Sequence, residues 1–182
     1  MWDFIKKHSY DAVKMLVTQV SISIFGLVLS LTCLNAKNEP LLFACSAGAV
    51  LFYLFLIYTS VWDMGAKDSI PLQYERISYQ PRKGLYISLI AHSLTWLLAL
   101  FIVLGSFFPE GAFVYIMGNF CKTITLFILQ GMFSGLLTLE VAGVALNELA
   151  WIYLLLPLPT LATAWLGYLA GLKNIKIFGK KS

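Results

Sequence analysis

Five polar side chains inside otherwise apolar stretches could carry chemistry: Gln19, His92, Gln130, Glu140 and Asn147. Glu140 follows the nearly apolar run 131–139, where a carboxylate is costly unless it is solvated, paired or protonated. If this stretch is helical, Asn147 lies on the same face seven residues later. We therefore predict a ligand or ion site lined by Glu140 and Asn147, and count Gln130, His92 and Gln19 among its ligand-binding candidates.

Each candidate also has a structural interpretation. His92 has no second histidine near it in the sequence, and a lone histidine on a face of small residues is more often a packed, hydrogen-bonded side chain. Gln19 and Gln130 fit the role of hydrogen-bonding residues between helices. Glu140 fits an acid that marks the membrane–water interface. These alternatives stay open at the level of the sequence.

The sequence contains no motif typical of a catalytic site. It has no Gly-x-x-x-x-Gly-Lys-Ser/Thr nucleotide loop, no His-Glu-x-x-His zinc motif, no Gly-x-Ser-x-Gly elbow and no Cys-x-x-Cys pair. We therefore expect no catalytic residues, no metal site and no cofactor, and we do not expect an enzyme.

Composition predicts a multi-pass integral membrane protein. The chain has 182 residues, of which 59% are hydrophobic and 12% charged, and its mean hydropathy is +0.80. Soluble domains are nearer half apolar and about a quarter charged. The net charge is +4, but the basic residues flank apolar segments, which favours a bilayer and not nucleic acid as the partner.

The apolar segments predict an all-α polytopic membrane bundle in a single domain, 1–182. Because about 20 apolar residues cross a bilayer, we predict four full spans at 15–34, 41–62, 85–108 and 151–172. The stretch 113–150 is interrupted by polar residues and is predicted to be a shorter, membrane-embedded helical hairpin or a re-entrant region. The segment 63–84 is predicted to be a polar loop.

The basic residues predict the orientation in the cell membrane. All Lys and Arg except Lys37 and Lys122 lie before the first span, in 63–84 or after the last span, so both termini and this loop should be cytoplasmic. An even number of crossings follows, and 113–150 must begin and end outside. A five-span alternative places the basic C-terminal tail outside.

Small residues supply faces for helix packing. The pairs Gly131/Gly135 and Gly167/Gly171 have the Gly-x-x-x-Gly spacing that lets helices approach closely. They predict a compact bundle or, as the alternative, contact with a second copy or with another membrane protein.

Two patches carry a resemblance to other proteins. The sequence Trp62-Asp63-Met64-Gly65-Ala66-Lys67-Asp68, together with Gly167–Gly171 before a basic tail, resembles small bacterial multi-pass membrane proteins of uncharacterised activity. This resemblance implies a membrane location and no particular activity.

Three functions fit this sequence. We favour a small-molecule transport or substrate-binding component. The alternatives are an accessory, immunity or assembly protein that works through helix contacts, and a lipid-modifying membrane enzyme. Polar residues that converge on one pocket would favour the first of these.

Overall fold

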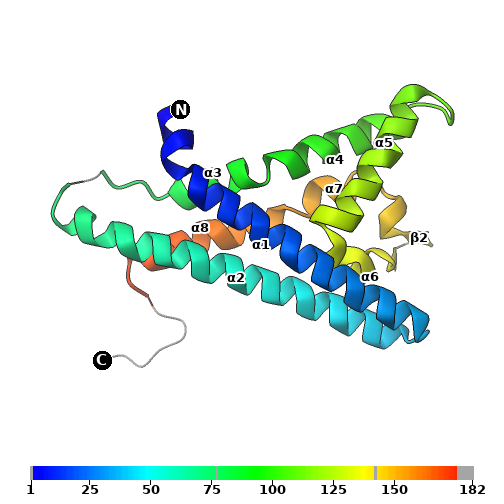
Figure 1. The fold of residues 1–182 in the computed structure, drawn as a ribbon, viewed down its shortest axis with the longest axis horizontal. Coiled ribbons are helices and arrows are strands. Elements are labelled where there is room, and N and C mark those ends of the chain that lie inside the picture. Colours follow the sequence, from blue (N-terminus) through cyan, green and yellow to red (C-terminus); the bar gives the residue numbers. More distant parts are fainter. Residues whose placement is uncertain (1, 77, 142, 176–182) are drawn as a thin grey trace.

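The protein is almost entirely helical in the residues that the computed structural model describes, 2–76, 78–141 and 143–175. Two long helices, α1 (Trp2–Asn35) and α2 (Glu39–Gln73), form an antiparallel pair (Figure 1). The chain continues through α3 (Lys83–Ala91), α4 (Ser93–Ser106) and α5 (Phe113–Ile124).

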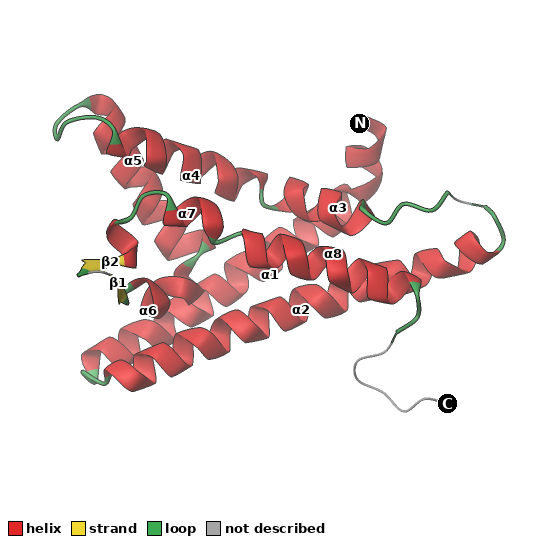
Figure 2. Cartoon of the chain, turned by 180° about the vertical axis from the view of Figure 1, so that it is seen from behind, coloured by secondary structure: helices red, strands yellow, loops and turns green. Residues whose placement is uncertain are grey.

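The second half of the chain consists of short elements before one longer helix. A π-helix (Thr125–Leu129) and a 3-10 turn (Gly131–Phe133) lead into α6 (Ser134–Leu137). The strands β1 (Glu140–Val141) and β2 (Val144–Ala145) form a small antiparallel ladder, visible in Figure 2. A second 3-10 turn (Leu146–Glu148), α7 (Ile152–Leu155) and α8 (Leu158–Leu172) follow.

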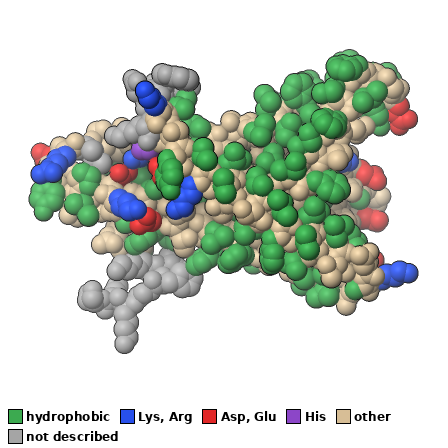
Figure 3. All heavy atoms as spheres, in the orientation of Figure 1, with side chains coloured by type: hydrophobic (Ala, Val, Ile, Leu, Met, Phe, Trp, Pro, Cys, Tyr) green, Lys and Arg blue, Asp and Glu red, His purple; other side chains and the backbone are tan. Residues whose placement is uncertain are grey.

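The predicted all-helical fold is confirmed. Three helical stretches are long and apolar enough to cross a membrane: His8–Asn35, Glu39–Gln73 and Ile152–Leu172. Two bent pairs also qualify if each is one span, α3 with α4, bent by 57°, and Phe113–Leu129 with Gly131–Leu137, bent by 89°. Hydrophobic side chains cover the middle of the molecule and charged ones gather toward its ends (Figure 3).

The two ends of the bundle differ. At one end, which we call the basic end, α1 and α3 begin and α2 and α8 finish (Figure 1). At the other end, the hairpin end, lie the α1–α2 turn, the α4–α5 turn and the β1–β2 ladder. The described members of the three predicted basic clusters belong to the basic end. Lys176, Lys180 and Lys181 lie outside the described residues.

The pair α1–α2 is built on small polar residues. The Asn38 side chain caps α2 by accepting a hydrogen bond from the Leu41 backbone N–H at 3.1 Å. Deeper in the pair, the Ser30 and Ser46 hydroxyls lie 3.0 Å apart and both side chains are buried. In an apolar surrounding, such paired hydroxyls hold two helices in register.

Helix α8 lies along α2 at the basic end and runs parallel to it. A Cβ atom built on Gly167 would lie 3.0 Å from the Tyr58 carbonyl oxygen, and one built on Gly65 would lie 3.1 Å from the Gly171 Cα. The Trp62 indole N–H donates to the Ile175 carbonyl at 2.7 Å. The sequence 62–68, singled out by its resemblance to other proteins, is thus a helix-packing element.

Two local predictions are wrong. The segment 63–84 is not all loop, because α2 continues to Gln73, and Pro71 is accommodated in its last turn. Residues 140–141 and 144–145 are not helical but form the β1–β2 ladder, and Gly143 between the strands has the left-handed conformation at φ +80°. Glu140 and Asn147 therefore do not share a helical face.

Candidate functional site

The five predicted site residues fall into two separate regions. Gln19, His92 and Gln130 are buried. His92 and Gln130 lie at helix breaks, whereas Gln19 lies within the continuous helix α1. Glu140 and Asn147 lie at the hairpin end, in the connection between α6 and α7. The structure therefore brings three of the candidates into the core and leaves the other two outside it.

Gln19 connects α1 to the interrupted helices. Its Nε2 donates to the Thr95 hydroxyl at 3.2 Å and to the Leu129 carbonyl at 3.1 Å. Leu129 ends the π-helix and directly precedes Gln130, so its carbonyl has no regular helical partner. The Gln19 amide replaces that partner in a region where water is scarce.

His92 occupies the break between α3 and α4. Its Nδ1 lies 2.8 Å from the Ser88 carbonyl, which can only accept, so Nδ1 carries the proton. The Tyr53 hydroxyl lies 2.8 Å from Nε2 and donates to it in the neutral ring. His92 and Tyr53 are both fully buried, which gives this histidine a hydrogen-bonded packing environment.

Polar oxygens without partners lie on α1 and on the bent pair Phe113–Leu129 and Gly131–Leu137. Within the described structure, Gln19 Oε1, Thr125 Oγ1 and Gln130 Oε1 are buried and accept or donate no hydrogen bond. Close by, the Gly131 backbone N–H donates to the Ser23 hydroxyl at 2.6 Å. Buried oxygens of this kind are usually satisfied by internal water.

Glu140 and Asn147 have different surroundings. Glu140 is exposed on β1, opposite Ala145 in the ladder. Asn147 is half-buried, its Oδ1 has no hydrogen-bond partner among the described residues, and its backbone carbonyl accepts from the Tyr153 hydroxyl at 3.3 Å. Neither Asn147 nor Glu140 lines the pocket described next, although Asn147 is hydrogen-bonded to Tyr153, which does.

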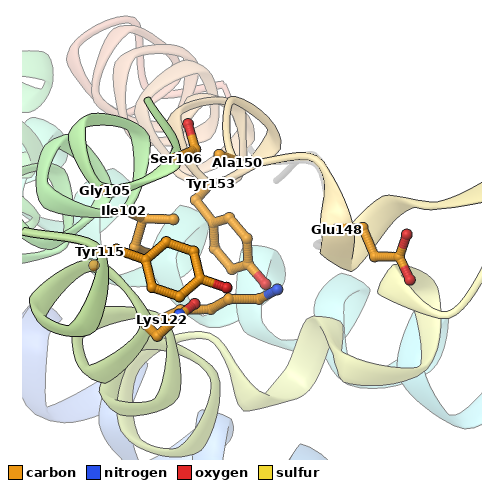
Figure 4. A pocket seen from close by; sticks show the side chains of 10 residues that line it. Ile102, Gly105, Ser106, Tyr115, Lys122, Glu148, Ala150 and Tyr153 are labelled. Carbon is orange, nitrogen blue, oxygen red and sulfur yellow. The ribbon is translucent and has the colours of Figure 1, made fainter. Parts of the chain in front are cut away.

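A pocket of about 230 Å³ lies between α4, α5 and the residues around α7 (Figure 4). We call it the α4–α5 pocket. The side chains that can interact with a ligand there are Ser106, Tyr115, Asn119, Lys122, Glu148 and Tyr153. Its volume is below the roughly 300–1,000 Å³ of pockets for drug-sized ligands, so it suits a small metabolite or headgroup.

Two glycines form the crossing of α4 and α5 beside this pocket. A Cβ atom on Gly105 would lie 2.9 Å from the Gly118 Cα, and one on Gly118 equally close to the Gly105 Cα. The backbones of α4 and α5 therefore touch at this crossing. Tyr115 and Lys122 lie about one helical turn to either side of Gly118, so their side chains border the space beside the crossing.

The pocket contains two opposite charges that do not pair. The Lys122 ammonium is half-buried and lies 5.9 Å from the centre of the Tyr153 ring, a cation–π geometry. Among the described residues, no carboxylate lies within 4 Å of this ammonium. The Glu148 side chain is exposed at the rim, apart from Lys122 (Figure 4).

The sequence analysis did not predict Ser106, Tyr115, Asn119 or Tyr153 as site residues. One signal was present: Tyr115, Asn119 and Lys122 follow one another at spacings of four and three, which places them on one helical face. Lys122 is also the lone basic residue of 113–150. The contribution of α7 had no comparable signal, because it depends on how the chain returns from the ladder.

A fold alone says little about function, which depends on the groups placed at a site. The α4–α5 pocket brings a cation, an anion, two phenols, a hydroxyl and an amide to one small space. Comparisons with protein-family models, with curated proteins and with solved structures gave no significant match, so the chemistry of this pocket carries the functional argument.

Proposed function

We propose that this chain is a membrane-embedded component that binds a small polar molecule, in transport or in substrate capture. The observation that carries this proposal is the α4–α5 pocket, where Lys122 and Tyr115 of α5 converge with Glu148 from the 3-10 turn before α7. A concave site with a few convergent polar groups is the usual form of a small-molecule site. An unpaired, half-buried ammonium is costly to maintain unless a ligand or water compensates it.

The packing of the glycines supports binding within one chain over an accessory role through exposed helix faces. Cβ atoms on Gly131 and Gly135 would meet α1 and α2 respectively, at Ser23 and Leu42. Those on Gly167 and Gly171 would meet α2. Both Gly-x-x-x-Gly faces are therefore occupied inside the bundle, and association with a second copy or another protein stays a prediction.

We further propose four crossings, with the basic end cytoplasmic and Phe113–Leu137 as a re-entrant segment. The segment begins at the α4–α5 turn, and its Leu129 carbonyl is bonded to Gln19 near the middle of α1. It then turns back, and the Gly135 N–H donates to Ser46 Oγ at 3.0 Å, near the α1–α2 turn. Its irregular tip is buried in protein, as the backbone polar groups require.

Cysteine labelling tests this topology. In a variant without Cys33, Cys45 and Cys121, single cysteines at Glu110 and Val144 are expected to react with an impermeant maleimide on intact cells. A cysteine at Ser78 is expected to react only after lysis. Reaction at positions 110 and 144 from opposite sides of the membrane would contradict the re-entrant segment, and reaction at 78 in intact cells would contradict the orientation.

Filling the pocket tests the proposed function. Ala150 lines the pocket, so Ala150→Phe should remove ligand-induced thermal stabilisation of the purified protein while the unliganded melting temperature stays near wild type. The probes are amino acids, carboxylates, amines and phosphate esters. The matched control is Ala36→Phe, at an exposed position beside the α1–α2 turn. If every stabilising probe acts equally on Ala150→Phe, the pocket is not the binding site.

A further inference from the structure

The charges of the α4–α5 pocket indicate a class of ligand. We propose that the pocket selects small zwitterions, with Lys122 binding the acidic group of the ligand and Glu148 its ammonium group. This inference rests on the proposed function and narrows it from small polar molecules to molecules that carry both charges.

Lys122 is the residue that binds the acidic group of the ligand. It belongs to α5, and its ammonium lies in the pocket beside the ring of Tyr153 (Figure 4). An ammonium is a compact point charge with three donors, which suits a carboxylate or a phosphate oxygen. Because none of the described carboxylates pairs with it, this charge is available to a ligand.

Glu148 is the residue that binds the ammonium group of the ligand. It ends the 3-10 turn before α7 and stands at the rim of the same pocket. Glu148 is close enough to interact electrostatically with Lys122 and yet forms no direct ion pair with it within 4 Å. A ligand with an acidic and an ammonium group can bridge this separation.

The pair also excludes ligands with one charge. A simple anion attracted to Lys122 meets the negative Glu148, and a simple cation attracted to Glu148 meets the positive Lys122. Selectivity of this kind comes from repulsion of the wrong partner as much as from attraction of the right one. The rings of Tyr115 and Tyr153 add faces on which an ammonium is favourable.

Two sources supply this chemistry. One is a free metabolite of the size of an amino acid, and the other is the headgroup of a phosphatidylethanolamine lipid. The hairpin end, where the pocket lies, is the proposed outer interface of the membrane, so both can reach it. The shared chemistry is one acidic and one ammonium group separated by a few bonds.

The test compares matched ligands on purified full-length protein in detergent. Glycine, β-alanine, 4-aminobutyrate and phosphoethanolamine vary the separation of the two charges, and butyrate, butylamine and ethyl phosphate each lack one charge. At least one zwitterion should bind about tenfold more tightly than its single-charge analogues. Equal binding of the analogues, or no binding by any of the four zwitterions, would overturn the zwitterion proposal.

Charge variants assign the two halves. Lys122→Met should bind the zwitterion about tenfold more weakly than wild type. Glu148→Gln should bind the acidic analogue and the zwitterion with equal affinity, because the charge that repels a simple anion is gone. Glu140→Gln, at an exposed acid outside the pocket, is the matched control and should behave as wild type. Loss of binding in Glu140→Gln alone would move the site away from the pocket and overturn the assignment.

The two proposals fail differently. If single-charge probes bind and Ala150→Phe blocks them, small-molecule binding in the pocket stands and zwitterion selectivity falls. If Ala150→Phe blocks no probe, the proposed function itself falls. Nanodiscs with and without phosphatidylethanolamine separate the sources: competition by this lipid with the bound free zwitterion identifies the headgroup, and undiminished binding identifies the metabolite.

Discussion

Gly65→Leu is expected to lower the free energy of unfolding by about 3 kcal/mol, because overpacking at a close backbone contact forces helices apart. A Cβ atom at this position would clash with the Tyr168 carbonyl oxygen and lie 3.0 Å from the Leu172 N. Both atoms belong to the backbone of α8, so no side-chain rotation can relieve the contact. The loss should appear as a lower midpoint in denaturant or thermal unfolding in detergent.

Gly48→Leu is the matched control for this substitution. Gly48 lies on the same helix, α2, and a Cβ atom there would meet nothing within 4 Å. Leucine is also a better helix former than glycine, by up to about 1 kcal/mol. Gly48→Leu should therefore be neutral or stabilising. Equal midpoints for Gly65→Leu and Gly48→Leu would show that α2 and α8 do not cross closely at Gly65.

The helical framework could be predicted from the sequence because a bilayer imposes one strong constraint. A backbone in lipid must satisfy its own hydrogen bonds, so apolar stretches of sufficient length become helices. The segments 15–34 and 41–62 accordingly lie within α1 and α2. Hydropathy could not show that α2 continues to Gln73, because that extension depends on packing against α8 and α3.

The candidate site was harder to predict because it forms only in the folded chain. Glu140 stood out in a linear reading, but Gly143 turns the chain and exposes this acid on a two-residue strand. Tyr153 enters the pocket from beyond the ladder, on a separate element from Lys122. Periodicity along one helix cannot reveal such a convergence, since it depends on tertiary packing.

The two acids of the sequence 62–68 also show that a sequence does not reveal which contacts tertiary packing creates. Asp63 and Asp68 lie on the same helix, and each forms a 2.6 Å ion pair with a lysine. The Asp63–Lys67 pair is exposed, with side chains 55% and 74% accessible. The Asp68–Lys83 pair is 20% and 14% accessible, and Asp68 also accepts from the Tyr168 hydroxyl at 2.7 Å. The sequence does not distinguish the surface acid from the one that joins α2, α3 and α8.

Asp68→Asn is expected to lower the free energy of unfolding by about 2 kcal/mol, because it leaves the largely buried Lys83 ammonium without its counter-charge. The carboxylate of Asp68 is the shared acceptor for two helices, and an amide replaces only part of that role. Asp63→Asn removes a charge from an equally short but exposed pair and should leave stability nearly unchanged. Unfolding midpoints of the two variants in the same detergent give the comparison.

A second substitution separates the loss of the ion pair from a general disturbance of the basic end. Lys83→Met removes the ammonium that Asp68→Asn leaves unpaired, so the double variant should be more stable than the sum of the two single losses predicts. The coupling should persist in high salt, since a pair that is mostly removed from water is weakly screened. Additive losses in this cycle, or equal losses in Asp63→Asn and Asp68→Asn, would contradict the role of Asp68 as the acceptor that joins α3 and α8 to α2.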